Sequence, residues 1–177
     1  IKLMIVIFTG NGKGKTTAAL GQAVRALGQD KKVLIIQFIK GPWVSGEHKF
    51  FGKLKLNKKN FKLIRAGKGF VKILGDKTPF LEHKKAAQNA LELAEKEIGG
   101  QKWDLIILDE INVAVNLKLI KTKDVLKTFS KSASIDIILT GRNAPKSFIK
   151  IADLATEMKE IKHPFSKGKL AKKGTEY

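Results

Sequence analysis

Residues 9–21 read TGNGKGKTTAALG and follow directly on the apolar run LMIVIF at residues 3–8. The apolar run predicts a buried strand, and residues 15–28 predict a helix that ends at Gly28. Three glycines and two lysines lie within six residues at the junction. A glycine-rich turn at a helix N-terminus presents backbone N–H groups to an anion, and lysine adds positive charge. The stretch therefore predicts a strand, a phosphate-binding loop and a helix, which begin an α/β fold.

The end of this loop, Gly14-Lys15-Thr16, has the spacing of a P-loop, in which the lysine reaches the phosphates and the hydroxyl binds Mg²⁺. The usual pattern has a glycine five residues before Gly14, where this sequence has Thr9. The glycines between them keep the turn permissive. A glycine-rich turn with an incidental lysine is the alternative, and we set it aside because strand, loop and helix occur together.

The remaining chain alternates short apolar runs with amphipathic stretches. Strands are predicted at residues 33–38, 61–65, 105–108, 135–139 and 155–161, and helices at residues 79–98, 122–131 and 145–152. This alternation predicts a mostly parallel, twisted sheet flanked by helices, a P-loop NTPase-like fold of the RecA-like type in a single domain over residues 1–177. Residues 41–60 are expected to form a surface excursion, and the tail from about residue 163 is expected to be irregular.

A second motif, WDLIILDE at residues 103–110, ends a predicted strand with two acids, Asp109 and Glu110. At the carboxyl end of a parallel strand these acids can reach a metal ion beside the bound phosphates. Two P-loop classes are excluded by pattern. GDKTP and NKKN do not match the N-K-x-D guanine reader of GTPases, and the loop lacks the KGGxGK arrangement of dimeric ATPases.

Composition limits the setting of the protein. The chain has no cysteine, which excludes disulfides and thiolate metal sites and fits a cytoplasmic protein. Its longest apolar runs are about six residues, against roughly 20 for a membrane helix, so we expect no membrane partner.

The net charge of +19 raises nucleic acid as a partner, because phosphate contacts favour basic surfaces. The excess is lysine, with 32 Lys and only 3 Arg, whereas arginine is the usual reader of guanine. We therefore expect a solvated lysine-rich surface and no nucleic-acid partner. A nucleic-acid-stimulated RecA-like ATPase remains the alternative function, although it also needs a water-polarising residue and usually an arginine finger.

The sequence resembles, almost end to end, the P-loop corrinoid adenosyltransferases, which adenosylate cobalamin and its precursors. The resemblance rests on FTGNGKGKTTAALGQAVRALG, QFIKGPWVSGE, GKGF, LDEIN, TGR and a tail similar to the family's F..G..A..GIEY. It implies a transferase that moves the 5′-deoxyadenosyl group of ATP to the Co(I) of a reduced corrinoid and releases triphosphate, in adenosylcobalamin biosynthesis or salvage. It also implies Mg²⁺ or Mn²⁺, a homodimer, and a reductase or flavoprotein that supplies electrons.

The resemblance also implies roles for particular residues. ATP binding is assigned to Gly10, Asn11, Gly12, Lys13, Gly14, Lys15, Thr16, Thr17 and Arg25. Metal binding is assigned to Thr16 and Glu110, with Asp109 behind the metal or sharing it. The catalytic group is Lys15, Thr16, Glu110 and Phe70. For Arg25, an ordinary charge on a helix surface stays as the alternative.

The corrinoid is assigned by resemblance to Gly67, Gly69, Phe70 and Asn112. The family commonly reads G-x-G-F-T-W, and this sequence has Lys72 where the family has its second aromatic residue. The preferred corrinoid therefore stays open. Two alternatives remain, an ordinary core role for Phe70 and a turn role for Asn112. We expect Glu47, in the SGE segment, to be a solvated surface acid.

Overall fold

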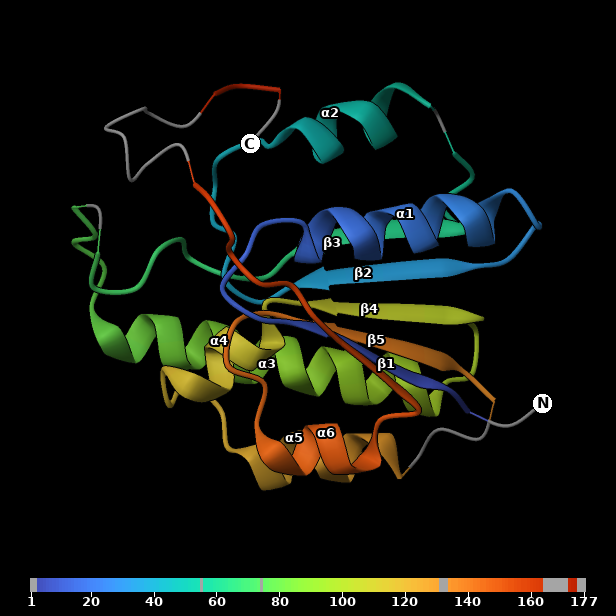
Figure 1. Cartoon of the computed structure of the whole chain (residues 1–177). Coiled ribbons are helices and arrows are strands. Elements are labelled where there is room, and N and C mark those ends of the chain that lie inside the picture. The colour runs from blue at the N-terminus through green and yellow to red at the C-terminus, as the bar shows by residue number, and fades with distance from the viewer. Residues whose placement is uncertain (1–2, 55, 74, 131–133, 164–171, 175–177) are drawn as a thin grey trace.

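A computed structural model describes residues 3–54, 56–73, 75–130, 134–163 and 172–174. Its centre is a sheet of six parallel strands in the order β3-β2-β4-β5-β1-β6 (Figure 1). The strands are β1 (Ile5–Thr9), β2 (Val33–Gln37), β3 (Phe61–Arg65), β4 (Leu105–Asp109), β5 (Asp136–Thr140) and β6 (Leu154–Glu157). The α/β prediction is confirmed, and β5 separates the loop-bearing strand β1 from the acid-bearing strand β4.

The burial of the strands follows their sequences. Every residue of β2 and β4 is buried, and both are rich in Ile, Leu and Val, as strands covered on both faces should be. The edge strand β6, LATE, is exposed along its whole length and contains no β-branched aliphatic residue. The sheet is therefore most apolar at its centre, and its central strands place the functional loops.

Helices cover both faces of the sheet. They are α1 (Lys15–Leu27), α2 (Gly46–Lys53), α3 (Phe80–Gly99), α4 (Ile111–Asn116), α5 (Thr122–Phe129) and α6 (Lys146–Ile151). Figure 1 shows α1 and α2 on one face, with α3, α5 and α6 on the other. Each face has its own cluster of buried apolar side chains. None of the described helices is both long and apolar enough to span a lipid bilayer.

The elements differ from the sequence predictions in three places. The excursion at residues 41–60 contains α2, which is anchored because Phe51 is buried and its ring lies 4.3 Å from that of Phe61, centroid to centroid. Helix α4 had no sequence signal, since it has six residues. The last strand covers residues 154–157 and not 155–161. The predicted ends at residue 131 and most of the tail after 163 lie outside the described residues.

The two edges of the parallel sheet differ in content. The carboxyl ends of β1, β2, β4 and β5 lead into the glycine loop, residues 38–45, Glu110 and residues 141–145. The opposite edge carries short turns at residues 28–32 and 100–104, which are joined by a hydrogen bond from the Lys32 amide to Asp104 Oδ2 at 2.8 Å. Candidate functional residues therefore gather at the carboxyl edge.

Candidate active site

The glycine loop connects β1 to α1 and leaves the start of that helix without a capping side chain. Gly14 is the N-cap residue with φ 109°, and the first turn contains no acidic residue. The first backbone N–H groups of a helix have no partner within the helix. Here they combine with the positive end of the helix dipole, which makes this end of α1 suited to an anion such as phosphate.

Gly10 and Gly12 also allow a close approach of the chain that follows β6. A Cβ atom on Gly10 would lie 2.3 Å from the Met158 carbonyl oxygen, and one on Gly12 would lie 2.8 Å from it. The Gly12 N–H donates to that same oxygen at 2.7 Å. Close packing therefore requires both glycines, and the phosphate-binding role predicted for them stays a prediction.

Lys15 is buried and folded back into the loop. Its Nζ donates to the Gly12 carbonyl oxygen at 2.6 Å. Burial lowers the pKa of Lys15, the charge of Glu110 raises it, and Arg142 lowers it further. The ammonium group therefore lies inside the loop, where the phosphates of a nucleotide would meet a positive charge.

Asp109, at the end of β4, is 1% exposed and accepts three side-chain hydrogen bonds. Thr16 Oγ1 and Thr140 Oγ1 donate to its Oδ1 at 2.8 and 2.7 Å, and Gln37 Nε2 donates to its Oδ2 at 3.0 Å. Asp109 thus joins the P-loop helix to β5 and β2. The structure brings together Thr16 and Asp109, two residues that the sequence placed at one metal site.

Glu110 begins α4 in a left-handed conformation with φ 61°, and its N–H donates to Thr140 Oγ1 at 2.9 Å. Burial raises the pKa of Glu110 to about 7, and the charge of Asp109 adds to that rise, while Lys15, Lys40 and Arg142 oppose it. Glu110 is therefore hard to ionise beside Asp109 unless a cation lies next to the pair. Such a pair, next to the Thr16 hydroxyl, has the oxygen ligands that Mg²⁺ prefers.

Glu47 is not the solvated surface acid that we expected. Its side chain is 13% exposed, and its Oε1 pairs with Lys40 Nζ and accepts a hydrogen bond from Gln37 Nε2 at 3.3 Å. Burial raises the pKa of Glu47, but hydrogen bonds from Lys40, its own backbone amide and Ser45 outweigh that effect and lower the pKa to about 2. Because Gln37 also bonds Asp109, a continuous polar chain connects α2 to the P-loop helix.

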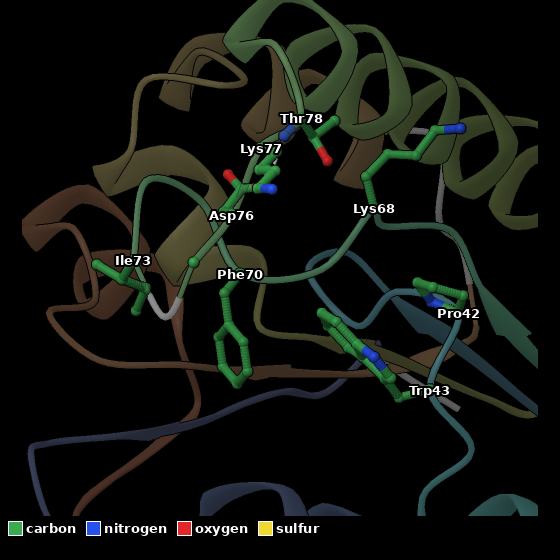
Figure 2. A pocket seen from close by; sticks show the side chains of 9 residues that line it. Pro42, Trp43, Lys68, Phe70, Ile73, Asp76, Lys77 and Thr78 are labelled. Atoms are coloured by element: carbon green, nitrogen blue, oxygen red, sulfur yellow. Dashed lines mark hydrogen bonds between the residues drawn. The ribbon is translucent and has the colours of Figure 1, made fainter.

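Phe70 lies at the surface, so its alternative role as a core aromatic is wrong. Its side chain is 46% exposed, and its ring centroid lies 5.8 Å from that of Trp43, with the planes at 33°. Both rings line a cavity of about 220 Å³ (Figure 2). Gly67 and Gly69 shape this loop. A Cβ atom on Gly67 would lie 2.3 Å from the Ile39 carbonyl oxygen.

The other predicted site residues lie in different surroundings. Asn112 is fully buried in α4, where its Nδ2 donates to the Gly141 carbonyl at 3.0 Å and its Oδ1 has no partner, so the turn alternative is wrong. Arg25 is exposed in the last turn of α1, about 15 Å along the helix axis from Lys15. Asn11, Lys13 and Thr17 are exposed at the loop.

Several polar or aromatic residues at this edge were not singled out from the sequence. They are Gln37, Lys40, Trp43, Thr140 and Arg142. Three of them stand in QFIKGPWVSGE, and the other two, Thr140 and Arg142, stand in TGR. The motifs therefore held a signal although no single residue did.

Comparisons with known proteins agree with this arrangement. The family model described as ATP:corrinoid adenosyltransferase BtuR/CobO/CobP matches residues 2–177. Proteins named corrinoid adenosyltransferase from Sinorhizobium sp and from Escherichia coli K12 are 34% and 31% identical, over 99% and 98% of this chain and 81% and 85% of their own. The corrinoid adenosyltransferase CobA of Salmonella typhimurium is 32% identical over 98% of this chain and 85% of its own.

Likeness to solved structures is weaker. The crystal structure of a DNA replication initiation factor aligns with 89% of this chain and 40% of its own, at 13% identity and a TM-score of 0.42. A likeness at that level says nothing of function.

Proposed function

Because the chain belongs to the ATP:corrinoid adenosyltransferase family BtuR/CobO/CobP, it is an adenosyltransferase, and we propose that it transfers the 5′-deoxyadenosyl group of ATP to the Co(I) of a reduced corrinoid. The proposal is supported above all by the polar chain from Thr16 through Asp109 and Gln37 to Glu47. That chain ties the phosphate loop to the segment that bears Trp43. A nucleotide site and an exposed aromatic pair are thereby held at one edge of the sheet.

In this reaction the cobalt–carbon bond forms as the bond from C5′ to the triphosphate oxygen breaks. The electron pair of that bond leaves with the triphosphate, so negative charge grows at the phosphate end of ATP. Lys15 and the amides at the start of α1 stabilise this charge where it develops. Co(I) brings its own electron pair, and the step therefore requires no general base.

Mg²⁺, or Mn²⁺ in its place, would be held by the Thr16 hydroxyl and the Glu110 carboxylate. Asp109 orients Thr16 through their hydrogen bond and is already engaged by Thr140 and Gln37. Burial and the charge of Asp109 raise the pKa of Glu110 to about 7, and a cation at this place would favour the ionised carboxylate. When bound, the ion supplies charge that neutralises the phosphates.

The remaining features of the proposal rest on the sequence. Its resemblance implies a homodimer, a reductase or flavoprotein that supplies the electrons, and ATP contacts from Arg25. Corrinoid contacts from Gly67, Gly69, Phe70 and Asn112 are implied by the same resemblance. Its length and composition suggest a single domain over residues 1–177 and a cytoplasmic location.

The test is to mix the protein with ATP, Mg²⁺ and chemically reduced cobalamin and to look for a light-sensitive cobalt–carbon product. Intact triphosphate should accumulate in step with that product. Lys15→Ala serves as the inactive control. Release of ADP and inorganic phosphate, stimulated by DNA or RNA and without any cobalt–carbon product, would contradict the proposal and favour the ATPase alternative.

A further inference from the structure

Trp43 is an exposed aromatic residue that contributes little to the hydrophobic core. It follows β2 in the segment before α2, and it is 62% exposed beside Phe70. Pro42 and Val44 on the same segment, and Ile73 beyond Phe70, are exposed as well. Leaving this much apolar surface in water costs free energy, and a contiguous apolar patch of this kind commonly marks a binding surface.

The backbone that carries Trp43 is held by hydrogen bonds from Arg65 and by close packing on the Phe70 loop. The Arg65 guanidinium, at the end of β3, donates to the carbonyl oxygens of Pro42 at 2.8 Å and Trp43 at 3.2 Å. Gly41 is packed so closely on the Phe70 loop that a Cβ atom on it would lie 2.6 Å from the Gly69 nitrogen. The backbones of the two loops are therefore packed directly against each other.

The ring of Trp43 is also placed by the loop opposite. A Cβ atom on Gly69 would lie 2.7 Å from the Trp43 ring, and Gly69 has φ 111°, which disfavours other residues. Figure 2 shows the Trp43 and Phe70 side chains beside each other, with Ile73 beyond Phe70. The absence of a side chain at Gly69 thus leaves room for the Trp43 indole, although most of the indole is in contact with solvent.

Lys72 follows Phe70 on the same loop and adds a charge in place of a ring. Its Nζ lies 4.7 Å from the centre of the Phe80 ring, at the start of α3. The loop therefore contributes Phe70 as its one aromatic ring to the cavity. Trp43, from a different segment, stands next to it.

We propose that Trp43 forms, together with Phe70, the surface on which the flat apolar face of the corrin macrocycle rests, and that Arg65 is the positioning residue for Trp43. This inference rests on the proposed function and extends its corrinoid site to a second segment of the chain. The adenine of ATP is the competing occupant. The rings of Trp43 and Phe70 lie side by side at 5.8 Å, too close to admit a base between them, so they offer one broad surface suited to a wide ring system.

The test measures binding and not turnover. Equilibrium dialysis with cob(II)alamin in the presence of ATP and Mg²⁺ gives the corrinoid Kd, and a parallel titration gives the ATP Kd. Trp43→Ala should raise the corrinoid Kd about tenfold, as loss of an aromatic stacking partner predicts, and leave the ATP Kd within about twofold. Trp43→Phe should recover most of the affinity. Ile151→Ala, an exposed apolar residue on α6, is the control and should change neither constant.

Arg65 has a readout of its own, because the chain contains only two tryptophans and Trp103 is buried, with its Nε1 donating to Glu97. In a Trp103→Phe background the emission comes from Trp43 alone. Arg65→Ala should lower the fluorescence anisotropy of Trp43 in the free protein and weaken corrinoid binding, without weakening ATP binding. Arg65→Lys should recover part of both, since one donor can still reach a carbonyl oxygen.

The outcomes separate the two proposals. If the wild-type protein binds no corrinoid, the proposed function fails, and this inference fails with it. If the wild type binds corrinoid and Trp43→Ala binds it equally well, only this inference is overturned. A rise in the ATP Kd with an unchanged corrinoid Kd would instead assign Trp43 to adenine and overturn it too. Thermal melts should show little change for Trp43→Ala, because the side chain is mostly exposed.

Discussion

The hydroxyl of Thr16 donates to Asp109 Oδ1 at 2.8 Å, which joins the first turn of α1 to the end of β4. These residues are 93 positions apart in the sequence. Strand β5 lies between β1, which leads into the loop before Thr16, and β4, which ends at Asp109. It contributes Thr140 to the same carboxylate oxygen. One helix and two strands, α1, β4 and β5, therefore meet at one carboxylate oxygen atom, and the first prediction tests that contact.

Thr16→Ser should keep the hydroxyl and most of the activity, whereas Thr16→Val should lose both the bond to Asp109 and the proposed metal ligand. We expect Thr16→Val to reduce adenosylation by at least about 100-fold at a fixed Mg²⁺ concentration, by analogy with the loss of an electrostatic catalytic group. Initial rates with reduced cobalamin check this. Similar rates for the two variants would remove Thr16 from the metal site.

Glu110 should make the stability of the ligand-free protein depend on pH. Its pKa is raised to about 7 from 4.5. Below about pH 4.5 both folded and unfolded states are protonated, and between there and pH 7 only the unfolded state loses its proton, so stability falls as pH rises. Glu110→Gln removes that cost, which is on the order of 1–3 kcal/mol. Its melting temperature should therefore exceed that of the wild type by a few degrees more at pH 8 than at pH 5. A difference that is the same at both pH values would contradict the buried, protonated carboxyl.

Glu110→Gln should also raise the Mg²⁺ concentration needed for half-maximal activity. The physical reason is the loss of a negatively charged oxygen ligand, which weakens the attraction for a divalent ion. Lys118→Gln, an exposed substitution that follows α4, is the matched control. Magnesium titrations of both variants at saturating ATP provide the measurement, and an equal shift in the two would argue against a metal ligand at Glu110.

Glu47→Ala should destabilise the fold although it lies in a segment that looked like a surface excursion. The substitution leaves Lys40 without its carboxylate and removes one of the two acceptors of the buried Gln37 amide group. Loss of a partner for buried polar groups costs about 1–3 kcal/mol. Glu92→Ala, an exposed acid on α3, should stay within about 0.5 kcal/mol. Urea denaturation of the two variants compares them directly, and equal midpoints would show that the polar chain contributes nothing to stability.

Gly10→Ala and Gly21→Ala should have opposite effects. At Gly10 the new Cβ would lie 2.3 Å from the Met158 oxygen, and φ is 96°, so we expect a loss of about 2–4 kcal/mol. Gly21 lies within α1 with no atom within 4 Å of its would-be Cβ, so alanine should add about 0.5–1 kcal/mol. Thermal melts check the direction of both stability changes. A Gly10→Ala variant as stable as the wild type would disprove the tight contact between Gly10 and Met158.

Phe70→Ala should affect reduction of the corrinoid more than the fold. Because Phe70 is 46% exposed, its removal should cost less than the about 3–5 kcal/mol of a buried phenylalanine. We expect from the sequence resemblance that Phe70 occupies the place of an axial ligand of cobalt, and a cobalt without that ligand is reduced more easily. The variant should therefore be slow when the reaction starts from Co(II) and nearly normal when Co(I) is supplied. Parallel loss in both assays and in the melting temperature would end this role for Phe70.

The strands were predictable because their apolar runs are continuous, and the loop was predictable because glycines and lysines recur at fixed spacing. Helix α2 was not, since it buries only Phe51 and the rest of its sequence is polar, basic or exposed. Helix α4 follows Glu110, whose left-handed backbone conformation no residue preference signals. Local sequence propensity predicts neither α2 nor α4, because tertiary contacts stabilise both helices.

The candidate site was predictable in its parts and not in its connections. The sequence placed Thr16, Asp109 and Glu110 at one site because strand ends converge in a parallel sheet. It could not pair Glu47 with Gln37, ten residues apart, because that pairing depends on where α2 turns back over β2. Trp43 and Phe70 meet for the same reason, as two loops from neighbouring strands that only the folded chain brings together.

The turns at residues 28–32 and 100–104 lie at the edge of the sheet opposite the glycine loop and the aromatic pair, and they are bonded to each other through Lys32 and Asp104. Labels, surface tethers and fusion partners can therefore be attached at that end, away from the candidate site. A fluorophore on Lys31, whose side chain is half exposed, or a surface tether attached there would point an immobilised enzyme's reactive edge into solution. The same end is the natural place to fuse an electron-donating protein on a flexible linker long enough to reach around the sheet, so that reduction and alkylation could be run on one polypeptide.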